Sequence, residues 1–159
     1  MTWLVLKIGK VRYLASGSAA VFLALMAMDI GPESIARSFT WQVMTGTGLL
    51  VCMLYQWMIF IQRFTQTTTN ARQHYLAHRW VGVGATVLFA VHAVRPGEVW
   101  MTALSMIFIA VAVTGLLNRE VVKYKKQSMY MAWLAVHMCL SAMLIPFVTV
   151  HIWAALAYQ

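Results

Sequence analysis

Residues 130–158 of the chain, YMAWLAVHMCLSAMLIPFVTVHIWAALAY, decide its architecture. The run is apolar and long enough to cross a bilayer as one α-helix, because a membrane helix needs about 20 predominantly apolar residues. It carries His137 and His151, fourteen residues apart. Fourteen residues advance an α-helix by about 21 Å and return to within roughly 40° of the same face. The two histidines are therefore predicted to share one stripe of one helix, each nearer a different membrane surface.

An earlier apolar run repeats this pattern. Residues 75–94, YLAHRWVGVGATVLFAVHAV, carry His78 and His92, again fourteen residues apart. Two helices with matched histidine pairs would present four imidazoles in two layers, and a neutral imidazole is a common metal ligand. The repeated spacing therefore predicts a frame for two metal-containing cofactors, one nearer each surface of a membrane.

The composition places the whole chain in a bilayer. Of its 159 residues, 62% are hydrophobic and only 10% are charged, which is too apolar for a soluble domain of this size. Cys52 and Cys139 both lie inside apolar runs, so they suggest no disulfide framework, and no Cys-x-x-Cys-His motif for covalent haem attachment occurs. The excess of basic residues is typical of membrane topology, so we expect contact with lipid and none with nucleic acid.

Five apolar runs predict an all-α membrane protein, a single domain over residues 1–159 with five transmembrane helices in a bundle. Residues 1–12 are mixed apolar and basic, and they are expected to lie along the membrane interface before the first span. The predicted spans are about 13–30, 41–62, 75–94, 99–117 and 130–158.

Charge predicts the orientation of these spans. Ten of the twelve basic residues fall in the N-terminal segment, the 63–79 connection and the 118–129 connection, which lie on one side of the membrane in a five-span topology. By the positive-inside rule that side is cytoplasmic, so the N-terminus is predicted inside and the C-terminus outside. A bacterial inner membrane suits this bias. The ten are Lys7, Lys10, Arg12, Arg63, Arg72, Arg79, Arg119, Lys123, Lys125 and Lys126; the other two are Arg37 and Arg95.

The same topology sorts the histidines into layers. Spans 75–94 and 130–158 are separated by one helix, so they run in the same direction. His78 is then expected at the inner depth with His137, and His92 at the outer depth with His151. Histidines inside a membrane span are costly and are interpreted by default as functional. The alternative for each one is an ordinary hydrogen bond to a neighbouring helix.

Haem iron is the metal that best fits two histidines from facing helices. Bis-histidine ligation leaves no open coordination position, so such a haem transfers electrons and does not activate small ligands. Gly82 and Ser141, each one turn after an inner histidine, would let a flat macrocycle lie against the helix backbone. Helix packing explains small residues at these positions equally well.

Three further polar residues lie near the predicted inner haem. Arg72 and Arg79 are candidates to pair with its propionates, since guanidinium groups bind carboxylates well; positive-inside or snorkelling positions explain both residues too. His74, one turn before His78, could replace it as a ligand, but pairing it with His137 would misalign the layers by about 6 Å. A propionate contact or a simple interfacial position is the better interpretation of His74.

The His-x13-His pairs at 78/92 and 137/151 resemble the membrane core of ferric reductase-like transmembrane proteins. That group includes the NADPH oxidases and the haem-binding membrane subunit of bacterial methionine sulfoxide reductase, and the pairs are also similar to the haem core of cytochrome b in bc-type complexes. The resemblance covers residues 75–158. It implies two haem b groups, one on His78 and His137 and the other on His92 and His151.

The departures from these families define the expected partners. No flavin or nicotinamide domain is expected after residue 158, and residues 96–100, PGEVW, only loosely resemble the Pro-Glu-Trp-Tyr quinol motif of cytochrome b. The chain is therefore predicted to exchange electrons with separate redox subunits, such as a cytochrome, an iron–sulfur protein or a molybdenum protein, or with quinone.

The sequence thus predicts a di-haem b-type cytochrome, an electron-transfer subunit of an oxidoreductase in a respiratory chain. It would carry electrons across the membrane between quinone or another redox donor and a partner protein. The first alternative is a non-catalytic membrane anchor or assembly subunit with one or no haem. The second is a proton or small-solute conductor that uses the histidine stripes, although this alternative leaves the equal spacing of the pairs unexplained.

Overall fold

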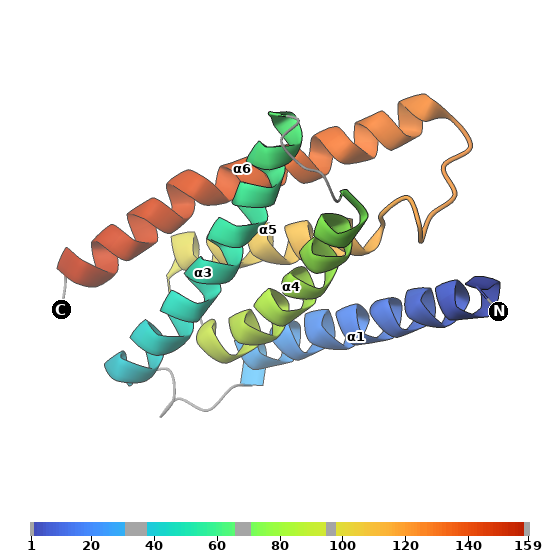
Figure 1. The fold of residues 1–159 in the computed structure, drawn as a ribbon. Coiled ribbons are helices and arrows are strands. Elements are labelled where there is room, and N and C mark those ends of the chain that lie inside the picture. The colour runs from blue at the N-terminus through green and yellow to red at the C-terminus, as the bar shows by residue number, and fades with distance from the viewer. Residues whose placement is uncertain (1, 31–37, 66–70, 95–97, 158–159) are drawn as a thin grey trace. The chain divides into compact units, whose positions relative to one another are not determined.

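A computed structural model describes residues 2–30, 38–65, 71–94 and 98–157, and helices are the regular secondary structure among these residues. Five helices follow one another along the chain (Figure 1). The predicted all-α class is confirmed for these residues. The helices are α1 (Thr2–Ile30), α3 (Phe39–Phe64), α4 (Ala71–His92), α5 (Val99–Leu116) and α6 (Gln127–Ala157).

The helix bounds lie close to the predicted spans, with one difference at the N-terminus. Residues 2–12 were expected to form a separate interfacial segment, whereas α1 runs without a break from Thr2 to Ile30. No proline or helix-terminating glycine separates the two stretches, so nothing in the sequence ends the helix before the span begins. Similarly, α6 continues through Pro146.

Four of the five helices are long and apolar enough to cross a membrane. The corresponding segments are Gly9–Asp29, Phe39–Gln62, Val99–Leu116 and Gln127–Ala157. The helix α4 is not among them, because its 22 residues include two arginines and three histidines. The chain therefore has the helix pattern of a membrane protein, and the fifth span stays a prediction.

The helices fall into two compact units, Met1–Arg95 and Pro96–Gln159. The first contains α1, α3 and α4, and the second contains α5 and α6. The single five-helix bundle expected over residues 1–159 stays a prediction.

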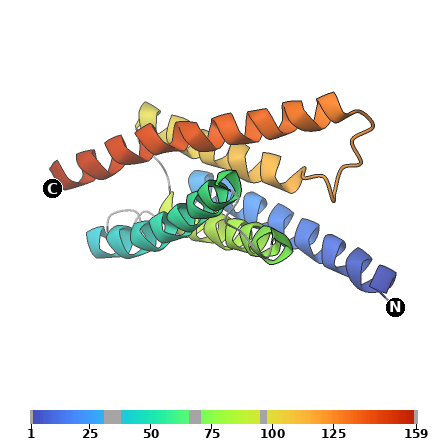
Figure 2. The same ribbon diagram turned by 45° about the horizontal axis from the view of Figure 1, so that its top comes forward.

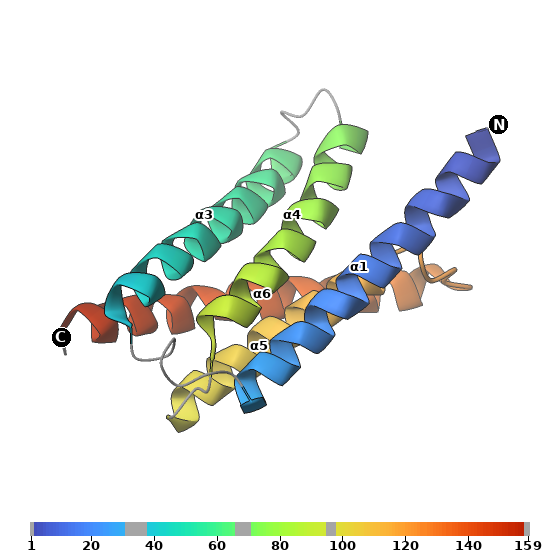
Figure 3. The same ribbon diagram turned by 90° about the horizontal axis from the view of Figure 1, so that it is seen from below.

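In the first unit the least apolar helix lies between two apolar ones. The helix α4 packs against both α1 and α3, and Figure 3 shows it between them. Polar groups cannot hydrogen-bond to lipid tails, so a helix with several polar side chains is most stable where neighbouring helices supply partners. The central position of α4 meets this requirement.

The α1 helix contributes a narrow, mostly small-residue face to this packing. Tyr13, Gly17, Ala20 and Ala24 recur every three or four residues and are all buried. Small side chains at this spacing let two helix backbones approach closely, which is the usual way that membrane helices pack. The neighbouring Ala19, by contrast, is exposed.

The second unit is a helical hairpin. The helices α5 and α6 pack along each other and run in opposite directions (Figure 2). Asn118, just after α5, has a buried side chain whose amide nitrogen donates to the carbonyl oxygen of Gly115 at 3.2 Å. Its side-chain oxygen accepts the backbone N–H groups of Glu120 and Val121 at 3.0 and 3.3 Å. This arrangement turns the chain away from α5.

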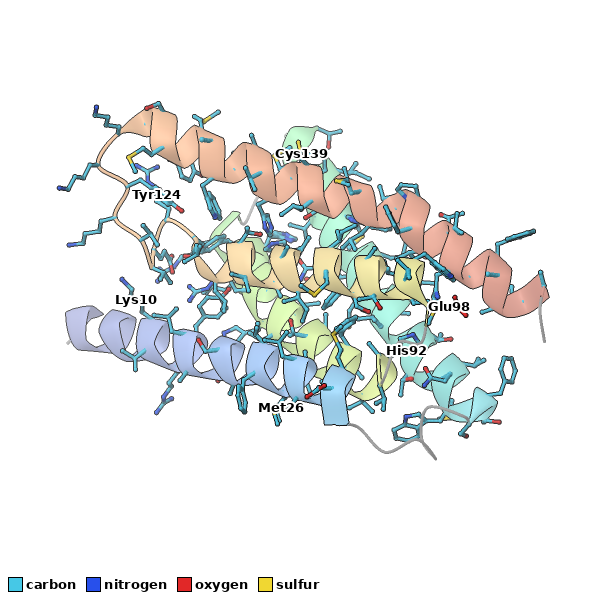
Figure 4. All side chains as sticks on the ribbon, turned by 180° about the vertical axis from the view of Figure 1, so that it is seen from behind. Lys10, Met26, His92, Glu98, Tyr124 and Cys139 are labelled. Atoms are coloured by element: carbon cyan, nitrogen blue, oxygen red, sulfur yellow. The ribbon has the colours of Figure 1, made fainter. Side chains whose placement is uncertain are left out.

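Tyr124 links the connection between α5 and α6 to the end of α5. Its hydroxyl donates to the carbonyl oxygen of Leu117 at 2.6 Å, and its ring packs against those of Tyr130 and Trp133. Desolvation raises the pKa of this phenol. Figure 4 shows Tyr124 and Glu98 at opposite ends of the hairpin.

We predict that Ala24→Leu destabilises the first unit while Ala19→Leu does not. Ala24 is fully buried, so a leucine there would overpack the close-packed face at a cost of about 1–3 kcal/mol. Ala19 is exposed on the same helix. Thermal unfolding of the purified protein in detergent measures the difference. Equal melting temperatures for the two variants would contradict the packing described for α1.

Candidate functional site

The four predicted ligand histidines are all half-buried on helices. His78 and His92 lie on α4 in the first unit, and His137 and His151 lie on α6 in the second. Within the described part of the chain no group of three or more His, Cys, Asp or Glu side chains could hold a metal ion. Bis-histidine haem ligation needs only two protein ligands per iron, so this observation does not bear on the predicted pairs.

His92 is held against the neighbouring helix α3 by a two-residue contact. Its Nδ1 lies 3.2 Å from the hydroxyl of Thr45. The ring also lies directly on Gly46, where an added Cβ would come within 2.9 Å of the His92 Cε1. Real Cβ atoms almost never approach so closely, so a glycine is required at position 46 for this ring position.

His137 makes a corresponding contact in the other unit. Its Nδ1 lies 2.9 Å from the hydroxyl of Thr114 on α5, and a Cβ added to Gly115 would lie 3.5 Å from the His137 Cε1. The indole of Trp133 stacks on this imidazole, with ring centroids 5.9 Å apart and an interplanar angle of 11°. Trp133 itself donates to the carbonyl oxygen of Thr114 at 2.9 Å.

The same type of histidine contact therefore occurs once in each unit. A Thr-Gly dipeptide on the preceding helix receives one histidine of the pair: the hydroxyl meets Nδ1, and the glycine backbone faces Cε1. Sequence reasoning did not single out Thr45, Gly46, Thr114 or Gly115. The Thr-Gly dipeptides could have pointed to these residues. The dipeptide also occurs at Thr47-Gly48, however, where the threonine is exposed.

The contacts of α3 with His78 and Gly82 involve the α4 backbone. Gln56 on α3 donates through Nε2 to the carbonyl oxygen of His78 at 2.9 Å. A Cβ added to Gly82 would lie 3.3 Å from that same nitrogen. The small residue at position 82 thus gives room to the Gln56 amide. Packing of Gly82 against a haem stays a prediction.

His151 lies beside an open apolar hollow in the second unit. Its ring centroid is 5.8 Å from that of Trp100, and Trp100 lines the hollow together with Pro146, Phe147 and Val150. The volume is about 230 Å³, below the roughly 300–1,000 Å³ of pockets that enclose a drug-sized ligand. The hollow could contribute one apolar wall to a site but could not enclose a haem.

The other residues that were predicted to contact a haem or its propionates differ in their surroundings. The buried Arg79 guanidinium lies 3.9 Å from the ring centroid of Tyr13 on α1, so this cation is held by an aromatic face. Arg72 is exposed, and His74 is half-buried. The hydroxyl of Ser141 donates to the carbonyl oxygen of His137 on its own helix at 2.7 Å. Propionate or haem contacts of these residues stay predictions.

Comparison of the chain with known protein families, with characterised proteins and with solved structures gives no match. The resemblance to ferric reductase-like proteins and cytochrome b therefore stays a prediction, based on the histidine spacing.

We predict that Gly46→Ala displaces the His92 ring while Gly48→Ala is tolerated. A Cβ at position 46 would come within 2.9 Å of His92 Cε1, whereas a Cβ at position 48 would lie 3.7 Å from the Leu88 side chain, an ordinary contact. Overpacking at position 46 should cost about 1–3 kcal/mol. Thermal unfolding in detergent compares the two variants. A Gly46→Ala protein as stable as Gly48→Ala would show that the ring does not rest on Gly46.

Proposed function

We propose that the chain is a di-haem b-type cytochrome, the electron-transfer subunit of a membrane oxidoreductase. His78 and His137 would ligate one haem iron, and His92 and His151 the other. The observation that carries the proposal is the identical fourteen-residue spacing of two half-buried histidine pairs on two long helices. The histidines at matching positions fall at matching depths if both helices run in the same direction through the membrane.

The environment of the histidines fits ligands better than surface residues. All four are half-buried, and in each unit one imidazole is held by a threonine of the neighbouring helix through Nδ1. Ligating histidines in metalloproteins typically have their second ring nitrogen bonded in this way. When bound, a bis-histidine haem supplies one-electron transfer without an open coordination position.

The proposal includes five spans, with the N-terminus in the cytoplasm and the C-terminus outside. The helix α4 is included although it is the least apolar, because α1 and α3 pack on it and supply partners to its polar groups. Its buried Arg79 lies on Tyr13, and its His92 contacts Thr45. The ten-to-two distribution of basic residues supports the orientation.

The proposed partners are an electron donor and an electron acceptor for the two haems. Electrons would pass between quinone or another redox donor and a separate redox subunit, such as a cytochrome, an iron–sulfur protein or a molybdenum protein. The bacterial inner membrane is the proposed location, since it suits a strong positive-inside bias. The ferric reductase-like and cytochrome b-like histidine spacing supports the same assignment.

A second candidate function is a non-catalytic membrane anchor or assembly subunit with one or no haem. The threonine–histidine contacts themselves favour it, because hydrogen bonds between polar side chains also hold membrane helices together. A proton or small-solute conductor is a third candidate that predicts no haem absorbance. Haem stoichiometry separates the first candidate from the other two.

We expect wild-type protein purified in detergent to contain two haem b per chain in a pyridine haemochrome assay. His92→Ala and His137→Ala should each lose about one haem, because each removes one ligand from a different iron. His74→Ala removes the α4 histidine that is not a proposed iron ligand, and it should retain both haems even where a propionate contact is lost. A folded wild-type protein without haem would overturn the cytochrome proposal, and loss of haem in His74→Ala would overturn the proposed pairing.

We also expect Gln73→Cys and Glu98→Cys to lie on opposite sides of the membrane. Gln73 lies in the first turn of α4, Glu98 lies just before α5, and both are exposed. Each cysteine is introduced after replacement of Cys52 and Cys139 and is probed in intact cells with a membrane-impermeant maleimide. Glu98→Cys should be labelled, whereas Gln73→Cys should be labelled only after the cells are permeabilised. Labelling of both in intact cells would show that α4 does not span the bilayer.

A further inference from the structure

We infer that Thr45 and Thr114 are positioning residues that fix which nitrogen of His92 and His137 can bind iron. Each threonine would accept the Nδ1–H of its histidine and so leave the lone pair on Nε2, the atom that then ligates haem iron. This inference rests on the proposed function. For each proposed haem, the inference adds a threonine that positions one of the two histidine ligands.

A threonine has a single hydroxyl proton, which it can donate to only one strong acceptor at a time. The Thr45 hydroxyl lies 2.8 Å from the carbonyl oxygen of Trp41, one turn back on α3, and 3.2 Å from the His92 Nδ1. The carbonyl can only accept, and it is the nearer partner. With its proton on the carbonyl, Thr45 can only accept from His92, so His92 must carry its proton on Nδ1.

Thr114 repeats this geometry in the other unit. Its hydroxyl lies 2.8 Å from the carbonyl oxygen of Ala110 and 3.0 Å from that of Val111. The His137 Nδ1 lies 2.9 Å from the same hydroxyl. Two carbonyl oxygens are thus available to receive the proton of Thr114. The hydroxyl oxygen then accepts from His137 Nδ1–H.

Other helical threonines show that donation to the carbonyl is the ordinary state in this chain. The hydroxyls of Thr86, Thr102 and Thr149 donate to carbonyl oxygens one turn back on their own helices, at 2.9, 3.1 and 2.8 Å. This is a common position for a threonine proton in a helix. Thr45 and Thr114 make the same bond and in addition meet a histidine from the next helix.

For a histidine ligand, this contact fixes both the tautomer and the orientation of the imidazole ring. An acceptor on Nδ1–H orients the imidazole and raises the basicity of Nε2, which strengthens ligation and favours ferric over ferrous iron. Because His92 and His137 belong to different proposed pairs, each haem would have one ligand anchored in this way. Loss of a contact of this kind typically lowers metal affinity by about 10- to 100-fold.

The experiment compares Thr45→Val and Thr114→Val with matched controls on the same helices, Thr47→Val on α3 and Thr102→Val on α5. Both control side chains are exposed. Haem titration of the purified protein, low-spin electron paramagnetic resonance and redox titration are measured for each. Thr45→Val should weaken the binding of the haem that is lost in His92→Ala. It should also shift the electron paramagnetic resonance signal of that haem and raise its midpoint potential. Thr114→Val should do the same to the other haem, and Thr→Ser at either position should restore wild-type behaviour.

The outcomes separate this inference from the proposed function. A wild-type protein without haem overturns the proposed function. Two haems in the wild type, with Thr45→Val and Thr114→Val indistinguishable from their controls, overturns the inference alone. Should the valine variants not fold, ¹⁵N-histidine spectra of the wild-type apoprotein test the tautomer directly. Protonated Nδ1 in His92 and His137 supports the inference, and protonated Nε2 with bare Nδ1 overturns it.

Discussion

The structure of the first unit depends on one constraint: polar groups within apolar helices must find partners in the protein, because lipid tails offer none. The helix α4 carries most of these groups, and α1 and α3 supply the partners. Tyr13 of α1 faces the Arg79 guanidinium, Gln56 of α3 donates to the carbonyl oxygen of His78, and Thr45 of α3 meets His92. The central position of α4 is therefore a consequence of its polarity.

In the second unit, α6 packs on α5, and several of its polar contacts lie at one end. Trp133 and His137 both contact Thr114 there, beside the connection that Asn118 and Tyr124 fasten to α5. The rest of α6 is largely apolar and exposed. Such a helix can be held in register by a few polar contacts at one end, since helix packing in membranes has little hydrophobic driving force of its own.

The sequence predicted the five helices well because each is a long apolar run bounded by charged residues, glycine or proline. It was less accurate where two stretches share one helix, as in α1, since a change from amphipathic to apolar composition does not end a helix. The histidine spacing could be seen in the sequence, but the partners of His92 and His137 could not. The Thr-Gly dipeptide occurs at 45, 47 and 114, and only the rotation of each helix decides which threonine faces a histidine. For Gly82 the sequence left haem packing and helix packing equally open, and only the structure shows the Gln56 amide beside it.

The choice between a cytochrome and a simple anchor depends on whether hydrogen bonding or metal ligation better explains the half-buried histidines. Hydrogen bonds between membrane helices contribute only about 0.6 kcal/mol on average, and serine or threonine could make them with less polar surface to bury. A neutral imidazole offers something that a hydroxyl cannot, namely a nitrogen lone pair that binds a metal while the other nitrogen is held by the protein. The contacts of His92 with Thr45 and of His137 with Thr114 are made by Nδ1 of each ring. Helix packing alone gives no reason for the repeated fourteen-residue spacing, whereas the proposed haem ligation accounts for it.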